Sequence, residues 1–475
     1  MTLTVSKQVK YLGLILDSKL HWKLNLEERA RKALGALYCS KSAIGKKWGL
    51  NPKCVYWLYE MVVEPILLYG VTFWWQVASK SSYCGILDKV RRQSALLITG
   101  AMRSTPTKAL YAMLGWLPTE LLLQEKAKSS AIRLSSIHSW GRTDIGHSTI
   151  LNKDFNAPTN IDHCISTLNF EKGFSHCIPS REDWDSGLNI PNRHLSIYTD
   201  GSKLDLRVGC GIYSKDLNLS ISYRLPDQCS VFQAEVKAIH CTAKWLLDHE
   251  IFGENIYIFS DSQAAIKSLA GVSSTSILVN ECRKSLDEIA SHSNLKLYWV
   301  PGHCDITGNC EADELARSGT RLPTVTFPLI GTPLATIKLQ VKEWYTAQAN
   351  AIWRAESTCS TTRQTWPSLT RRRTIDLLSL NRRSIQLTTS VLTGHCALGK
   401  HAERLGLPFN DYCRSCGSEE EEETVLHLMC QCPALARKRL TTLGAAFFPS
   451  LTSLSSLDIK DIARFLIKSN WFQPT

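Results

Sequence analysis

Four acidic side chains in the middle of the chain have the residue type and the spacing of a divalent-metal site. Asp200 ends a short, largely apolar run that begins at Leu195, and Asp261 directly follows a second apolar run. Glu235 lies near the start of a long helical pattern, and Asp313 lies one turn into another helical pattern. Strand ends and the adjoining helix starts are where α/β folds gather their ligands. The four carboxylates are therefore expected to meet at one place.

Each acid taken alone also has a plain interpretation as an ordinary surface or capping residue. Four carboxylates at one spot would repel one another strongly at low dielectric, so the arrangement makes sense only if cations neutralise it. Hard oxygen ligands favour Mg²⁺, or Mn²⁺ as an alternative, over zinc. The constellation therefore predicts a magnesium-type metal site.

Five short runs of β-branched and aromatic residues, bounded by turn residues, predict the strands that position these acids. A helical pattern from about Cys229 to His249 separates the first three runs from the fourth, which gives the order βββαβαβα. Two hairpins followed by helix-linked strands indicate an α/β fold, with a mixed five-stranded sheet and helices packed on its faces. The runs are Leu195 to Asp200, Val208 to Ser214, Leu219 to Arg224, Ile256 to Ser260 and Leu297 to Val300.

Five motifs within residues 193–320 resemble, in their order, those of the type 1 ribonuclease H family. Every catalytic position of that family is filled here by the expected residue type. The resemblance implies a ribonuclease H-like fold, two Mg²⁺ ions held by Asp200, Glu235, Asp261 and Asp313, and hydrolysis of the RNA strand of RNA/DNA hybrids. The motifs are Tyr198 to Ser202, Gln233 to Glu235, Ser260 to Ala265, Trp299 to His303 and Gly308 to Ala316.

The same resemblance assigns roles to further residues. It implies that His303 sits on a mobile loop and assists proton transfer or product release, although a solvated histidine in a Pro-Gly-His turn is the plainer interpretation. RNA differs from DNA by its 2′-hydroxyl, which both donates and accepts hydrogen bonds. The groups expected to contact the substrate there belong to Gly201, Ser202, Gln233 and Asn309.

Residues 1–135 carry apolar residues at helical spacing and are expected to be mainly α. The segment from Val9 to Trp22 resembles the stretch that follows the palm of non-LTR retrotransposon reverse transcriptases, while any strand and turn could give Tyr11-Leu-Gly13. The Tyr-x-Asp-Asp polymerase motif does not occur in the sequence, so polymerisation is not expected. The chain resembles the C-terminal portion of a jockey- or R1-like polyprotein, and residues 136–192, with prolines among polar residues, are predicted to be a linker.

Residues 325–475 are predicted to form a basic helical tail that contains a small zinc segment, 413–432. The segment has the pattern Cys-x2-Cys-x10-His-x4-Cys, whose residue types and spacing are typical of a structural zinc site. Similar endings occur in the same retrotransposon proteins. The alternatives are reduced core cysteines, or Cys430 as a competing ligand. The expected ligands are Cys413, Cys416, His427 and Cys432.

The balance of charge favours an anionic partner, since 55 Lys and Arg against 43 Asp and Glu leave a net charge of +12. Part of the surplus lies in the tail, where arginines and nearby tryptophans could bind nucleic acid by phosphate contacts and stacking. An amphipathic helix with its cationic face in water is an equal alternative. The residues are Arg371, Arg372, Arg373, Arg382 and Arg383, with Trp344, Trp353 and Trp366.

Cysteine usage and the missing secretory pattern indicate a reducing compartment. The 17 cysteines are an odd number, and most lie among apolar residues. We expect an intracellular protein of the nucleus or cytoplasm that is not secreted. The most apolar stretch, Met61 to Trp75, is shorter than a membrane span, so no membrane association is expected. Nothing in the sequence indicates the oligomeric state.

Three functions are compatible with these patterns. The first is a metal-dependent endonuclease for RNA/DNA hybrids. The second is a catalytically inactive fragment that only binds nucleic acid, which the intact set of four acids disfavours. The third is a transposase or integrase, whose acids usually form a triad without the Thr-Asp-Gly-Ser motif seen at Asp200.

Overall fold

The computed structural model describes residues 6–45, 48–141, 145–185, 193–302 and 306–471. The chain divides into two compact units. The sheet unit comprises Ser130–Gln340, and the helical unit comprises Met1–Ser129 together with Val341–Thr475. Each unit has its own core, and each is described by itself.

The sheet unit contains a mixed sheet with the strand order β5-β11-β9-β6-β7-β8. The pairs β6·β7 and β7·β8 are antiparallel, whereas β9, β11 and β5 continue the sheet in parallel from the other edge of β6. The mixed sheet with flanking helices, expected from the sequence, is confirmed. The strands are β6 (Leu195–Leu204), β7 (Arg207–Ser214), β8 (Leu219–Leu225), β9 (Asn255–Ser260), β11 (Asn294–Trp299) and β5 (Ser175–Cys177).

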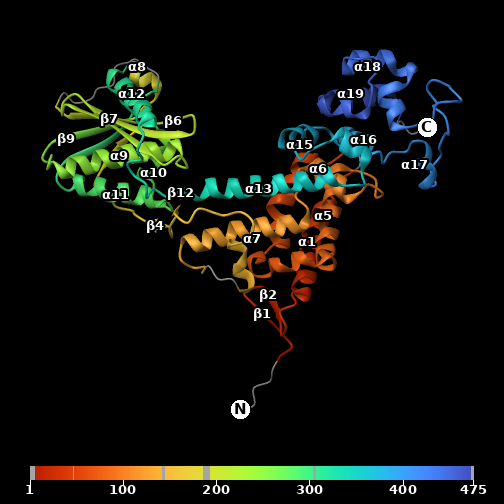
Figure 1. The fold of residues 1–475 in the computed structure, drawn as a ribbon, viewed down its shortest axis with the longest axis horizontal. Coiled ribbons are helices and arrows are strands. Elements are labelled where there is room, and N and C mark those ends of the chain that lie inside the picture. Colours follow the sequence, from red (N-terminus) through yellow and green to blue (C-terminus); the bar gives the residue numbers. More distant parts are fainter. Residues whose placement is uncertain (1–5, 46–47, 142–144, 186–192, 303–305, 472–475) are drawn as a thin grey trace. The chain divides into compact units, whose positions relative to one another are not determined.

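Helices cover both faces of this sheet (Figure 1). On one face, α9 (Val231–Asp248) packs against β6 and β7, and α11 (Ile277–Ala290) packs on α9. On the other face, α12 (Thr307–Arg321) packs across β6, β7 and β8. Successive residues of β7 face opposite sides of the sheet, so each side can pack against a different helix. Cys210 belongs to the apolar cluster under α9, while its neighbour Gly211 faces α12.

The core of the sheet unit lies between the central strands and α9. Ile197, Ile258 and Leu297 come from three neighbouring strands and are fully buried with Val236 and Ile239 of the helix. Each such side chain contributes roughly 1.5–3 kcal/mol on burial. The start of α9 is fixed by a capping box between Ser230 and Gln233.

Glycines in β7 let α12 approach the sheet at backbone distance. A Cβ at Gly211 would overlap the carbonyl oxygen of Ala312 and the amide nitrogen of Ala316. We therefore expect Gly211→Ala to lower the stability by roughly 2 kcal/mol or more, because neither backbone atom can rotate away. Thermal unfolding measured by circular dichroism tests this.

The control is Gly85 in α5 (Ser81–Thr99), where a Cβ would meet no described heavy atom within 4 Å. Gly85→Ala is expected to leave the stability unchanged or to raise it by up to about 1 kcal/mol. Equal melting temperatures for Gly211→Ala and the wild type would show that α12 does not depend on this close approach.

Residues 136–192 differ from the expected linker, and the sheet has six strands where five were expected. β5 adds a parallel edge strand beside β11, and β4 (Thr167–Leu168) pairs with β10 (Ser273–Ser274). The indole of Trp184 also donates to the carbonyl of Trp299 over 3.2 Å. These strands have two or three mostly polar residues, so they have no apolar alternation from which a strand could be predicted.

The helical unit is built from both ends of the chain, which the sequence analysis treated as separate segments. α1 (Lys23–Lys41) packs on α5, and α15 (Arg371–Leu378) and α16 (Arg382–Thr393) join them. Thr374 donates to the carbonyl oxygen of Met113 over 3.0 Å.

Two arginines of the basic tail stabilise this unit. Arg382 donates to the carbonyl oxygens of Leu50 and Leu97 at 2.8 and 2.7 Å, and Arg373 donates to that of Leu454 at 3.0 Å. The charge-assisted bonds of Arg382 join the N- and C-terminal parts of the unit, and that of Arg373 connects two helical segments of the C-terminal part.

The tryptophans of the tail are also partly in the core. Trp353 is 5% exposed and donates to the carbonyl oxygen of Trp366, whose own side chain is fully buried. Neither ring is therefore exposed for stacking on bases. The nucleic-acid prediction for the tail depends on the partly exposed Trp344 and on Arg371, Arg372 and Arg383.

Of the helices in the described part of the chain, none alone has both the length and the hydropathy of a membrane span. Two segments, Pro52–Leu67 and Val71–Val77, reach this length and hydropathy only together, and a bend of 53° separates them. The pair includes η1 (Tyr59–Val63), in which Tyr59 and Val63 are buried.

Candidate active site

Two neighbouring parallel strands bring the first two acids together. Asp200 lies on β6 and Asp261 directly follows β9, and the register places Thr199 opposite Ser260. Asp261 therefore lies beside Asp200, which is inside β6 at the point where its pairing with β9 ends. The indole of Trp299 holds the backbone of Asp261 by donating to its carbonyl oxygen over 2.9 Å.

The third acid comes from α9, which crosses over β6 at a glycine. A Cβ at Gly201 would lie 2.5 Å from the amide nitrogen of Glu235, so only glycine permits the helix to lie this close. As a result, one oxygen each from Asp200, Glu235 and Asp261 lie within 4.8 Å of one another. Sequence motifs far apart in the chain thus form one cluster.

The fourth acid completes the lining of a cavity of about 220 Å³. Asp313 of α12 lines this cavity but is not one of the three acids whose oxygens lie within 4.8 Å of one another. Its carboxylate instead lies 2.7 Å from the guanidinium of Arg317. The lining residues are Asp200, Gly201, Glu235, Asp261, Asn309, Cys310 and Asp313.

Burial and mutual repulsion disfavour the charged form of these carboxylates when no cation is bound. Burial, together with the charges of Asp261 and Asp313, raises the pKa of Asp200 to about 7. The pKa of Glu235 is raised well above its usual value by burial first and then by Asp200 and Asp261. Among the described residues, Oε2 of Glu235 has no hydrogen-bond partner. An unsatisfied buried carboxylate oxygen beside two more acids fits a divalent cation.

Comparison with known proteins identifies the family of one segment of the sheet unit. The RNase H family model matches residues 192–321. This segment is an RNase H domain. Its fold is RNase H-like, with the mixed sheet and flanking helices described above.

Two curated relatives of the chain are each titled "Retrovirus-related Pol polyprotein from type-1 retrotransposable element R1". The one from Nasonia vitripennis is 22% identical over 139 residues, which are 29% of this chain and 40% of the relative. The one from Bradysia coprophila is 21% identical over 132 residues, which are 28% and 13% of the two chains. The match thus spans less than half of either relative's length.

Among solved structures, the RNase H1 of the halophilic archaeon Halobacterium salinarum NRC-1 is 22% identical. The match covers 26% of this chain and 96% of that chain, with a TM-score of 0.21.

The residues expected to read the substrate have different surroundings in the RNase H domain. Gly201 and Asn309 line the acidic cavity, and Ser202 is partly exposed beside it on β6. Asn309 is only 4% exposed, and its Oδ1 has no hydrogen-bond partner among the described residues. His303 lies outside the described residues.

Gln233 differs from that expectation. Its side chain is 1% exposed, and its Nε2 donates to Asp162 and to the carbonyl oxygen of Gly331 at 2.9 and 3.0 Å. Its Oε1 accepts from the amide of Ser230 in the capping box. With these partners, the side-chain amide of Gln233 connects α9 to two segments of the sheet unit outside residues 192–321 and is not directed to a ligand.

Two residues of the site were not predicted from the sequence. Cys310 lines the cavity, and nothing but its place beside Asn309 indicates this. Arg317 lies four residues after Asp313, and this i,i+4 spacing on a helix is the signal that could have revealed the ion pair.

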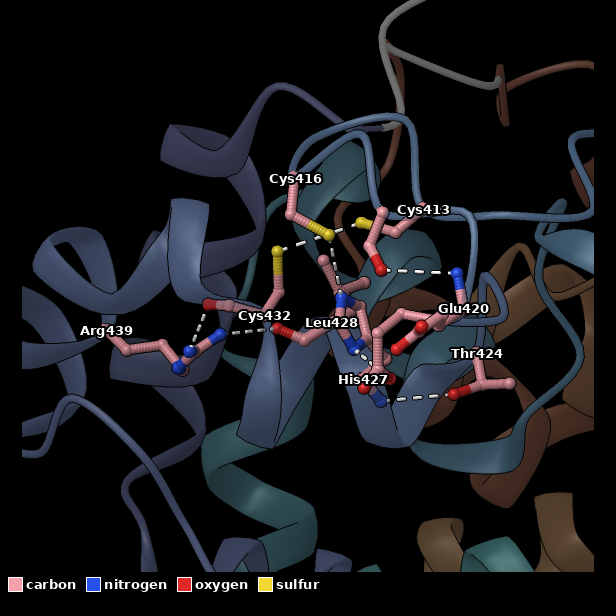
Figure 2. Close-up of polar contacts among 10 residues, drawn as sticks. Cys413, Cys416, Glu420, Thr424, His427, Leu428, Cys432 and Arg439 are labelled. Carbon is pink, nitrogen blue, oxygen red and sulfur yellow. Dashed lines mark hydrogen bonds and ion pairs between the residues drawn. The ribbon is translucent and has the colours of Figure 1, made fainter.

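The helical unit contains a second group of metal-ligand type. The donor atoms of Cys413, Cys416, His427 and Cys432 lie within 4.8 Å of one another. Figure 2 shows the three sulfurs and the imidazole facing a common centre. Cys430 is buried outside this group.

The separations within this cluster match a tetrahedral ion. With metal ligand distances of about 2.3 Å to sulfur and about 2.0 Å to nitrogen, tetrahedral geometry places two sulfurs about 3.8 Å apart and a sulfur and nitrogen about 3.5 Å apart. The Sγ atoms of Cys413 and Cys432 are 3.7 Å apart, and Sγ of Cys416 is 3.5 Å from Nε2 of His427. Nδ1 of His427 faces the carboxylate of Glu421 at 3.1 Å, the usual outer partner of a ligating histidine.

Proposed function

We propose that the RNase H domain is a metal-dependent endonuclease that hydrolyses the RNA strand of RNA/DNA hybrids, within a chain related to R1 retrotransposon polyproteins. The observation that carries the proposal is the convergence of Asp200, Glu235 and Asp261 in a cavity that Asp313 also lines. The buried, unpartnered oxygen of Glu235 supports cation binding at this place.

The four acids would hold two Mg²⁺ ions, with Mn²⁺ as an effective substitute. Bound divalent ions supply Lewis-acid stabilisation of phosphodiester cleavage and a water activated for in-line attack, which leaves 5′-phosphate and 3′-hydroxyl ends. Because phosphoryl chemistry needs positioned charge more than a protein nucleophile, the acids serve as ligands and not as attacking groups.

The chain's other residues would bind and orient the hybrid. Oδ1 of Asn309 is an acceptor without a described partner at the cavity wall, so it is suited to accept from a ribose 2′-hydroxyl. Gly201 lines the same cavity and Ser202 follows it on β6, so the backbone of the first and the hydroxyl of the second would also bind the hybrid. The resemblance to ribonucleases H adds His303 as the group that moves a proton or assists product release.

Labelled RNA/DNA hybrid, single-stranded RNA and duplex DNA, each incubated with the full chain in Mg²⁺ or EDTA, test this function. We expect RNA cleavage only in the hybrid and only with Mg²⁺, and its loss in Asp261→Asn. The matched control is Asp205→Asn, an exposed acid of the same domain, which should cut normally. Binding without cleavage by the wild type would instead support an inactive nucleic-acid-binding fragment, and cutting of duplex DNA would support a transposase-like enzyme.

We also propose that the cysteine and histidine cluster binds one structural Zn²⁺. Its four ligands close the coordination sphere, which is the arrangement of a structural site. The exposed arginines of the tail are proposed to add contacts to nucleic-acid phosphates. The proposed intracellular location is supported by the odd number of cysteines, most of which lie among apolar residues.

A further inference from the structure

Arg317 places a positive charge at the edge of the acidic cavity. It lies on α12 one turn after Asp313, and Nη2 of its guanidinium is 2.7 Å from Oδ2 of Asp313. Both side chains are partly exposed, at 46% and 29%.

The ion pair distinguishes Asp313 from the other acids. Asp200, Glu235 and Asp261 have oxygens within 4.8 Å of one another, whereas the carboxylate of Asp313 is engaged by Arg317 on the same helix. In the metal-free site, the carboxylate of Asp313 therefore has a cation from its own helix beside it.

A metal ion that binds Asp313 must overcome this cation. Oδ2 of Asp313 cannot accept fully from a guanidinium and also bind a divalent ion, and the two positive charges repel each other at short range. Exposure of the guanidinium allows Arg317 to rotate into solvent when the ion binds, so the competition does not exclude binding. It weakens binding.

We propose that Arg317 is an internal counter-cation that competes with metal for Asp313 and so sets the divalent-ion concentration at which the site fills. The proposal rests on the proposed metal-dependent function, because it concerns the same carboxylates. Arg317 is a positioning residue, since it acts through Asp313. The weaker of two metal ions is the one expected to depend on it.

Isothermal titration calorimetry of Mn²⁺ into the full chain, without nucleic acid, tests the proposal apart from catalysis. Arg317→Gln is expected to lower the Kd of the weaker ion about fivefold to tenfold, because it removes the competing charge. Arg317→Lys retains that charge and should stay within about twofold of the wild type. Arg321→Gln removes the same charge from an exposed position one turn further along α12 and should leave both Kd values unchanged.

Each other outcome has a distinct meaning. An unchanged or raised Kd in Arg317→Gln, with a melting temperature near that of the wild type, overturns the competition. Equal changes in Arg317→Gln and Arg321→Gln also overturn it, because they would reflect net charge alone. Absence of Mn²⁺ binding by the wild type would instead remove the proposed metal-dependent function, and the inference with it.

Discussion

Asp200→Asn is expected to abolish hybrid cleavage while it stabilises the metal-free protein. The loss of activity should be about 10³-fold or more, since the variant removes a ligand charge from the centre of the proposed site. The gain in stability follows from burial, which together with Asp261 and Asp313 raises the pKa of Asp200 to about 7. Removing a charge that the folded state disfavours therefore raises the stability of the metal-free protein.

The pH dependence of this stabilisation has a definite sign. The pKa of Asp200 rises from 3.8 to about 7 on folding, so between these values the folded state binds more protons than the unfolded state. Stability contributed by this group is then lost as the pH rises through that window. The difference between Asp200→Asn and the wild type in EDTA should grow from near zero at about pH 4 to a few kcal/mol at about pH 8.

Urea unfolding at several pH values in EDTA measures this difference, and Asp205→Asn serves as the exposed control with no expected gain. Saturating Mg²⁺ should reverse the order, because only the wild type has its full set of ligands. A variant that is less stable than the wild type in EDTA at pH 8 would mean that Asp200 is not repelled by its neighbours.

The acidic site could be predicted from the sequence because local patterns fix it. Each of Asp200 and Asp261 directly follows an apolar run, and parallel pairing of β6 with β9 brings the ends of these two runs together, although β6 itself continues to Leu204. Glu235 needed one more feature, the glycine at position 201, which allows α9 to cross β6 at backbone distance. The positions of the three acids follow from side-chain alternation along the strands and from the space that a glycine leaves. Alternation and glycine positions can both be recognised in the sequence.

Features that depend on tertiary contact could not be predicted in this way. Gln233 belongs to a family motif, yet its side-chain amide donates a hydrogen bond to Asp162, a distant residue in the expected linker. Arg382 looked like a phosphate contact, yet it donates to carbonyl groups more than 280 residues earlier in the chain. Polar groups with such distant partners leave no periodic pattern.

Cys416→Ser is expected to abolish zinc binding by the proposed site and to unfold the segment around it. The wild-type chain should contain one zinc ion, measured by atomic absorption after dialysis, and the variant close to none. A complete structural zinc site contributes on the order of 10 kcal/mol to local folding. Loss of one of four ligands should therefore make residues 413–432 sensitive to limited proteolysis, and a zinc chelator should do the same to the wild type.

Two control variants separate ligand loss from other effects. Cys39→Ser alters an exposed cysteine of the same unit and should retain both zinc and protease resistance. Cys430→Ser tests the alternative ligand. Cys430 is buried outside the cluster, so its replacement should weaken the packing of the core while the zinc content stays at one ion. If Cys430→Ser lost its zinc and Cys416→Ser kept it, the ligand set proposed from the 3.5 Å and 3.7 Å separations would be wrong. A chain that is protease resistant without zinc would show that these thiols are reduced core cysteines.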